Sequence, residues 1–154
     1  MDGNIIFLDI DGVMISREDI KRRYYRFNKH VLSWIPFSPV ALASLELIVR
    51  LTDANIVLSS SWRKLSGHKE FICEQLARNG LDDKLIDATP VIGRRDEEIK
   101  AWIEQNEFIG NFVILDDDSF DLTKYSAKLV KVSGKKGLTP MLSFSAIRRL
   151  GGRI

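Results

Sequence analysis

The sequence predicts an α/β domain in which a mainly parallel sheet is covered by helices on both faces. Short apolar runs alternate with segments of helical periodicity, and this alternation is typical of such sheets. Three of the runs, in residues 4–10, 55–58 and 111–115, lead directly into acidic or hydroxyl clusters. With 154 residues, of which 45% are hydrophobic, the chain has the length and core content expected of one domain, residues 1–154.

The expected elements of the first half begin with a buried strand over 4–10, because four consecutive apolar residues precede its acids. The basic and aromatic segment 14–35 is interpreted as a flap. Ser38 followed by Pro39 is a helix start, with a capping side chain and proline at the first helical position. The helix expected over 39–53 and the strand expected over 55–58 follow, and apolar side chains fall on one face of the helix at Leu42, Leu45, Ile48 and Val49.

The second half continues the alternation. A helix over 67–79 is expected to end at Asn79-Gly80, since glycine favours helix ends. The helix over 95–107 carries Ile99, Trp102 and Ile103 on one face. The other expected elements are a short strand from Ile86, strands over 111–115 and 128–132, and a last helix from Thr139-Pro140 to Gly151.

Two acidic clusters follow predicted strands. Asp9 and Asp11 lie two residues apart, so their side chains point to the same side of an extended chain, and Gly12 then permits a sharp turn. Asp116 and Asp117 follow the strand over 111–115. Clustered like charges need compensation, and oxygen ligands suit Mg²⁺. The alternative is a strand end with turn-forming Asp and Gly residues.

A hydroxyl cluster, Ser59 to Ser61, follows the strand over 55–58. Sites in open α/β sheets form at the carboxyl ends of the strands. The serines and the two acidic clusters are therefore expected to converge at one edge of the sheet.

These motifs resemble, in order, those of the haloacid dehalogenase (HAD) superfamily of phosphohydrolases. The matching stretches are Phe-Leu-Asp-Ile-Asp-Gly-Val at 7–13, Val-Leu-Ser at 57–59, a basic residue at Arg94 or Arg95, and Ile-Leu-Asp-Asp at 114–117. The resemblance implies a three-layer, Rossmann-like fold. It is closest to the small phosphatase-like domains of Swiss-army-knife RNA repair proteins, on the stretches 59–63, 95–102 and 137–139.

The resemblance also implies roles for individual residues. Asp9 is the expected nucleophile, Asp11 the general acid and base, and Mg²⁺ the cofactor. The expected metal ligands are Asp9, Asp117 and the backbone carbonyl of Asp11, with Asp116 in support. Ser59, by its hydroxyl and backbone N–H, and Arg95 are expected to bind the phosphoryl group. The further substrate-binding candidates are Gly12, Ser60, Arg63 and Arg94. The superfamily more often has lysine as its third motif, so Lys100 stays an alternative cation.

The substrate expected from the sequence is a phosphorylated nucleic-acid end or a nucleotide. The intervals between motifs leave no room for a large cap domain, and by resemblance capless members act on large substrates. Six Arg or Lys residues and several aromatic rings lie between Arg17 and His30, a mixture that suits nucleic acid. Two alternatives stay open: a small-molecule phosphatase, and a catalytically silent module that binds nucleic acid or protein.

A cytoplasmic protein without a membrane partner is the expectation for location. The sequence has no apolar run of about eighteen residues and no visible signal peptide. Cys73 is the only cysteine, so no disulfide forms within the chain. The oligomeric state does not follow from the sequence.

Overall fold

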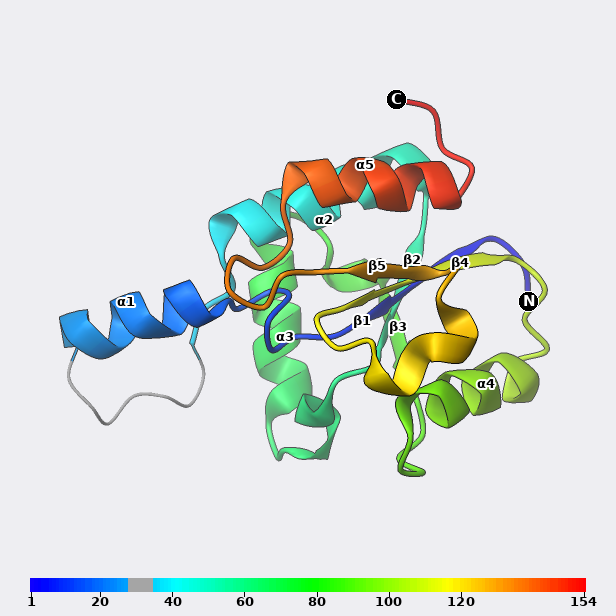
Figure 1. Cartoon of the computed structure of the whole chain (residues 1–154), viewed down its shortest axis with the longest axis horizontal. Helices are drawn as coiled ribbons and strands as arrows, with labels where there is room; N and C mark the ends of the chain where they lie inside the picture. Colours follow the sequence, from blue (N-terminus) through cyan, green and yellow to red (C-terminus); the bar gives the residue numbers. More distant parts are fainter. Residues whose placement is uncertain (28–34) are drawn as a thin grey trace.

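The structure, a computed structural model, describes the backbone of residues 1–27 and 35–154 and the side chains of residues 1–22 and 35–154 (Figure 1). Its centre is a five-stranded parallel sheet with the strand order β3-β2-β1-β4-β5. The strands are β1 (Asn4–Leu8), β2 (Asn55–Leu58), β3 (Leu85–Ala88), β4 (Asn111–Asp116) and β5 (Leu129–Lys131). The predicted α/β class is therefore confirmed, and so is the prediction that the three motif-bearing strands lie side by side.

The first strand is shorter than expected. β1 ends at Leu8 because the backbone turns tightly behind it: the amides of Val13, Met14 and Ile15 all donate to the carbonyl of Ile10. The amide of Asp9 still donates to the carbonyl of Leu115, at 3.0 Å. Asp9 is thus held by the neighbouring strand β4 although it lies just beyond the end of β1.

The two faces of the sheet bury different side chains of β1, as the two-residue period of a strand requires. Ile6 and Leu8 pack in the larger core cluster with α2 (Pro39–Thr52), α3 (His68–Ala77) and α5 (Pro140–Arg149). Ile5 and Phe7 pack in a second cluster with α4 (Arg95–Gln105) and the 3₁₀ helix η3 (Phe120–Tyr125). Figure 1 shows α2 and α5 on one side of the sheet and α4 on the other. This is the predicted three-layer arrangement.

The predicted helix starts are confirmed at both proline-containing caps. The Ser38 side chain accepts from the amide of Ala41, and the Thr139 side chain accepts from that of Leu142. Each helix then begins with a proline, which lacks the amide hydrogen that would be unpaired at this position.

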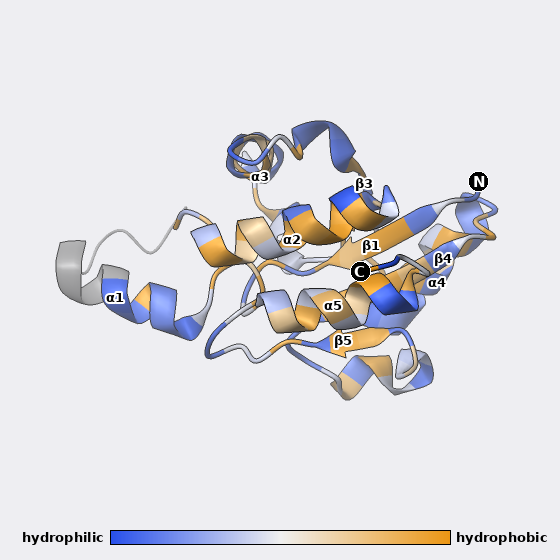
Figure 2. Cartoon of the chain, turned by 90° about the horizontal axis from the view of Figure 1, so that it is seen from above, coloured by the Kyte–Doolittle hydropathy of each residue, from blue (hydrophilic) through white to orange (hydrophobic). Residues whose placement is uncertain are grey.

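Among the described α-helices, α1 (Arg17–Phe27) was not predicted. It lies within the segment 14–35, interpreted as a flap. The Asp19 carboxylate accepts from the amide and hydroxyl of Ser16, whose hydroxyl accepts from the amide of Asp19, so the two residues cap the helix reciprocally. Figure 1 shows α1 projecting from the body, and Figure 2 shows it to be mostly hydrophilic while the strands are hydrophobic. The rest of the interpreted flap, 28–34, lies outside the described residues.

Among the helices that the structure describes, none combines the length and apolar character needed to cross a membrane.

Candidate active site

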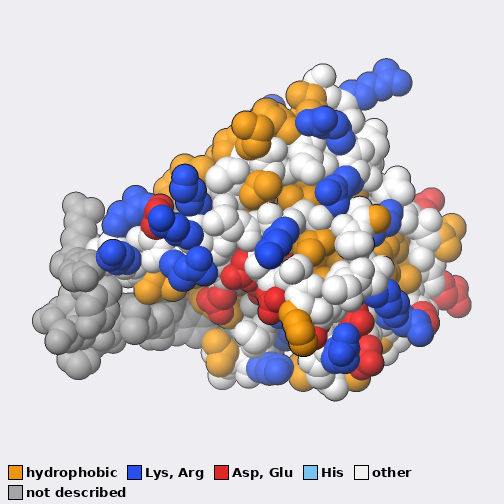
Figure 3. Space-filling model, viewed as in Figure 1, with side chains coloured by type: hydrophobic (Ala, Val, Ile, Leu, Met, Phe, Trp, Pro, Cys, Tyr) orange, Lys and Arg blue, Asp and Glu red, His pale blue; other side chains and the backbone are white. Residues whose placement is uncertain are grey.

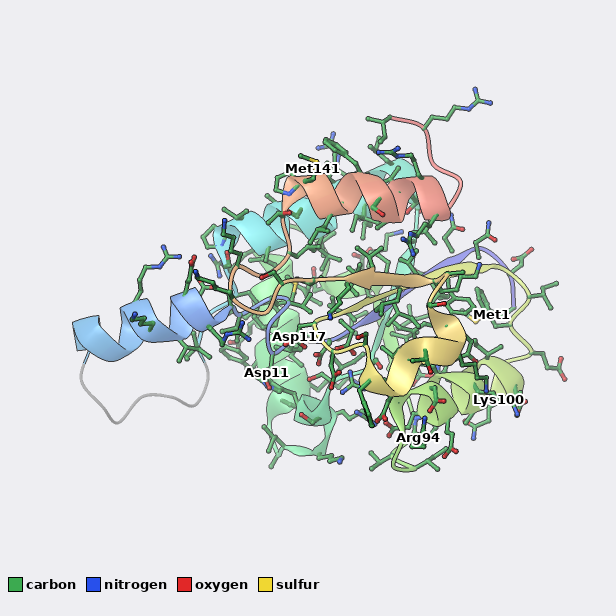
Figure 4. The ribbon with its side chains drawn as sticks, viewed as in Figure 1. Met1, Asp11, Arg94, Lys100, Asp117 and Met141 are labelled. Atoms are coloured by element: carbon green, nitrogen blue, oxygen red, sulfur yellow. The ribbon has the colours of Figure 1, made fainter. Side chains whose placement is uncertain are left out.

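Three carboxylates from two neighbouring strands meet at the carboxyl end of the sheet. Asp9 follows β1, Asp116 ends β4, and Asp117 comes next. Because β1 and β4 pair in parallel with Leu8 opposite Leu115, the residues that follow are brought together. One carboxylate oxygen from each of the three residues lies within 4.8 Å of the others. Figure 4 shows Asp117 near Asp11 at this end of the sheet.

The cluster is electrostatically costly without a cation. Burial, followed by the negative charge of Asp116, raises the pKa of Asp9 to about 8. Burial also raises the pKa of Asp116. The Arg95 guanidinium opposes both shifts: its Nη1 lies 2.7 Å from Asp116 Oδ2 and 3.6 Å from Asp9 Oδ1. The single positive charge of Arg95 does not balance three acids, so the donor set fits a divalent cation with oxygen ligands, such as Mg²⁺.

Gly12 permits the close approach of the two acidic loops. Its φ of +80° lies in the left-handed region, which glycine enters without a steric penalty. A Cβ atom at this position would lie 2.2 Å from Asp117 Oδ2, well inside contact distance. The structure thus gives Gly12 a steric role in forming the acid cluster, beside the substrate-binding role expected from the sequence.

Asp11 is not one of the three acids whose carboxylate oxygens cluster. Its side chain is exposed, and its Oδ2 accepts a hydrogen bond of 3.0 Å from the indole Nε1 of Trp62. Because the Asp11 carboxyl group is outside the cluster, it could take part in proton transfer. The backbone carbonyl of Asp11 lies in the turn that follows Asp9.

Ser59 reaches the expected edge of the sheet, directly after β2. Its hydroxyl is buried and, within the part of the chain that the structure describes, has no hydrogen-bond partner. Such an oxygen requires an explanation, and a bound phosphoryl group is one. Its backbone amide, however, donates to the Leu8 carbonyl at 2.8 Å. The expectation that this amide also binds phosphate is therefore wrong, because parallel pairing of the strands already uses it.

Ser60 and Arg63 are turned toward the protein interior. The Ser60 hydroxyl accepts from the amide of Trp62 and caps η1 (Ser61–Lys64). Arg63 donates to the carbonyls of Thr89, Ser60 and Pro90 and forms an ion pair with Glu98. Both side chains of this pair are only 5% exposed. These bonds occupy most of the donors of Arg63 and tie the loop after β2, residues 59–64 (the serine loop), to α4. Arg63 also lines the pocket described below, and its substrate contact stays a prediction.

Of the three candidate cations for the third motif, Arg94, Arg95 and Lys100, the fold places only Arg95 at the acid cluster. Arg95 reaches the acid cluster, as described above. Arg94 is exposed at the start of α4 and pairs with Asp96 at 3.2 Å, so it is not placed for the expected substrate contact. Lys100 lies further along α4 and pairs with Glu104 at 3.5 Å. Figure 4 shows Arg94 and Lys100 away from Asp11 and Asp117.

A polar pocket of about 120 Å³ opens beside the cluster, between the serine loop and η3. Its lining includes Ser61, Lys64, Arg95, Asp116 and Asp118. Figure 3 shows acidic side chains near the middle of this face, with Lys and Arg side chains around them. The pocket could hold the phosphate group of an ester, with the rest of the ester extending into solvent.

Glu98 and Arg17 contribute to the site although no sequence motif assigns them a role. Glu98 lies in the stretch 95–102, and nothing in the sequence pairs it with Arg63. Arg17 opens α1, and its Nη1 and Asp117 Oδ2 each lie 2.8 Å from the point that a Cβ on Gly134 would occupy. The two atoms are therefore at most twice that distance apart. The basic composition of α1 was the only available signal.

Comparison with known proteins agrees with this geometry. No curated protein and no solved structure matches the chain significantly. One family does match, over residues 5–141, and its description is "HAD domain in Swiss Army Knife RNA repair proteins". The match includes all three motif-bearing strands and α4, which supplies Arg95. The chain belongs to this family of HAD domains.

Proposed function

We propose that the protein is a Mg²⁺-dependent phosphatase that forms an aspartyl-phosphate on Asp9. Membership of a HAD family suggests a phosphatase or a related function. The observation that carries the finer proposal is the meeting of Asp9, Asp116 and Asp117 with Arg95, next to the Ser59 hydroxyl, which has no hydrogen-bond partner among the described residues.

The proposed hydrolysis of the phosphate ester has two steps, the formation of the aspartyl-phosphate on Asp9 and its hydrolysis. Asp9 attacks phosphorus as the bond to the leaving oxygen breaks, and Asp11 gives that oxygen a proton. Asp11 then takes a proton from water, which attacks phosphorus and releases phosphate and the Asp9 carboxylate. Arg95 and the Ser59 hydroxyl stabilise charge on the phosphoryl oxygens.

Asp9, Asp117 and the backbone carbonyl of Asp11 are the groups that would hold Mg²⁺, with Asp116 beside them. When bound, the ion supplies positive charge that favours the ionised form of Asp9 and offsets repulsion between carboxylate and phosphate. Ionisation matters because the raised pKa leaves much of Asp9 protonated near neutral pH, and a protonated carboxyl is a poor nucleophile.

Metal removal tests this proposal. With p-nitrophenyl phosphate as substrate, we expect turnover in Mg²⁺, loss of turnover in excess EDTA, and recovery when Mg²⁺ is restored. Turnover that persists in EDTA would contradict the assigned metal dependence. Absence of turnover with this ester, a nucleotide and phosphorylated oligonucleotides would favour the silent binding module.

We further propose that the preferred substrate is a phosphorylated nucleic-acid end or a nucleotide. The pocket is open. Exposed Arg17 at the start of α1 lies near Asp117 of the acid cluster, and exposed Lys21 and Arg22 follow on the same helix. Cations beyond the reacting phosphate provide contacts for further phosphates of a polyanion. The other basic and aromatic residues of this prediction, 23–27, Lys29 and His30, lie outside the described side chains.

The role of these cations is testable with an Arg17→Ala variant. We expect KM for a 3′- or 5′-phosphorylated oligonucleotide to rise several-fold, because one phosphate contact is lost, while KM for p-nitrophenyl phosphate changes little. KM for the oligonucleotide should also rise steeply with salt in the unaltered protein. Arg148→Ala, at an exposed position on α5, is the matched control and should leave both KM values unchanged. Equal salt dependence for both substrates would favour a small-molecule phosphatase.

A further inference from the structure

We propose that Trp62 is a positioning residue that holds the Asp11 carboxyl group toward the leaving group. This inference rests on the proposed function, and it assigns to Trp62 a role distinct from substrate stacking or core packing. The side chains come from separate loops: Asp11 follows β1, and Trp62 lies in η1 after β2.

The contact itself is direct. The indole Nε1 of Trp62 donates to Asp11 Oδ2 at 3.0 Å, although 51 residues separate the two in sequence. A hydrogen bond to a carboxylate is stronger than one between neutral groups and restrains the carboxylate's rotation. The other oxygen, Oδ1, is left for the reacting proton.

Trp62 is held firmly enough to act as a fixed donor. Its ring centroid lies 6.0 Å from that of Phe71 and 6.5 Å from that of Phe37, which is itself fully buried. Its backbone amide donates to the Ser60 hydroxyl at 3.2 Å. The indole therefore presents its N–H from a packed aromatic cluster joined to the core.

The position of Asp11 explains why it needs such an anchor. Asp9, Asp116 and Asp117 gather in the acid cluster, whereas the side chain of Asp11 is exposed and outside that group. An exposed carboxylate otherwise samples several rotamers. The indole contact selects one of them and so keeps the general acid apart from the metal-binding acids.

A Trp62→Phe variant separates positioning from packing, because phenylalanine keeps an aromatic ring but lacks the N–H. The readout is kcat/KM for two esters in Mg²⁺. An alkyl phosphate releases a poor leaving group that needs the proton of Asp11, whereas p-nitrophenyl phosphate releases an anion that is stable without it. We expect a loss of about tenfold or more for the alkyl ester, as for one hydrogen bond to a charged group, and a much smaller loss for p-nitrophenyl phosphate.

Trp102→Phe is the matched control. The Trp102 Nε1 also donates to a carboxylate, Asp87 Oδ2 at 2.7 Å, but on the α4 side of the sheet. Loss of this bond should change kcat/KM for the two esters by the same factor. An equal loss for both esters in Trp62→Phe would overturn the positioning role while leaving the phosphatase proposal intact. Absence of turnover by the unaltered protein with either ester would overturn both.

A measurement without turnover tests the contact itself, even where Trp62→Phe folds poorly. In ¹⁵N-labelled protein, Asp11→Ala removes the acceptor, so the indole N–H resonance of Trp62 should shift while that of Trp102 stays in place. An unchanged Trp62 resonance would overturn the proposal.

Discussion

Replacing Asp9 by Asn is expected to abolish phosphatase turnover while leaving the protein folded. An amide has nearly the shape of a carboxyl group but cannot form the aspartyl-phosphate. Folding should not suffer, because burial and the charge of Asp116 already disfavour the ionised form of Asp9. Turnover of p-nitrophenyl phosphate in Mg²⁺ and the thermal midpoint, compared with the unaltered protein, are the two measurements.

Two further variants place this result in context. Asp53→Asn changes the same residue type at the end of α2, where Asp53 pairs with Lys84, and should leave turnover unchanged. Asp11→Asn removes proton transfer and should lower kcat by about 10²–10⁴-fold. Near-normal turnover by the Asp9 variant would rule out the aspartyl-phosphate mechanism.

Replacing Glu98 by Ala is expected to destabilise the fold by about 3–5 kcal/mol. Glu98 neutralises the buried guanidinium of Arg63, and its Oε2 also accepts from the amide of Ile92 at 3.1 Å. Its removal leaves the buried guanidinium of Arg63 and the partly buried amide of Ile92 without their acceptor, and each carries a desolvation cost. The free energy of unfolding from urea denaturation measures the loss.

Glu97→Ala is the matched control, since this neighbour on α4 is exposed and should change stability by less than about 0.5 kcal/mol. The double variant Arg63→Met with Glu98→Met supplies a second test. Removing both charges should destabilise the protein less than removing Glu98 alone, because no uncompensated ion is left in the interior. A Glu98→Ala variant as stable as Glu97→Ala would show that the Arg63–Glu98 pair does not hold the serine loop.

Most of the helices and strands, and the residue types at the ends of the strands, could be predicted from the sequence alone. The apolar runs that become β1, β2 and β4 could be recognised because buried parallel strands require uninterrupted apolar residues. The caps at Ser38 and Thr139 could be recognised because their contacts lie within one turn of helix. The convergence of Asp9, Asp117 and Ser59 followed from the general rule for strand ends in parallel sheets. The capping of α1 by Ser16 and Asp19 is equally local, so this helix start could also have been predicted from the sequence.

Only the tertiary structure decided which side chains complete the site. Arg94 and Arg95 are adjacent in sequence, yet the start of α4 directs Arg95 to the acid cluster and leaves Arg94 exposed, paired with the buried Asp96. The Arg63–Glu98 ion pair joins the serine loop, which follows β2, to α4. The Trp62–Asp11 hydrogen bond joins the serine loop to the loop that follows β1. These contacts connect residues that are 35 and 51 positions apart. Local propensity and periodicity carry no information about such pairs, because strand order and the packing of helices on the sheet determine which loops meet.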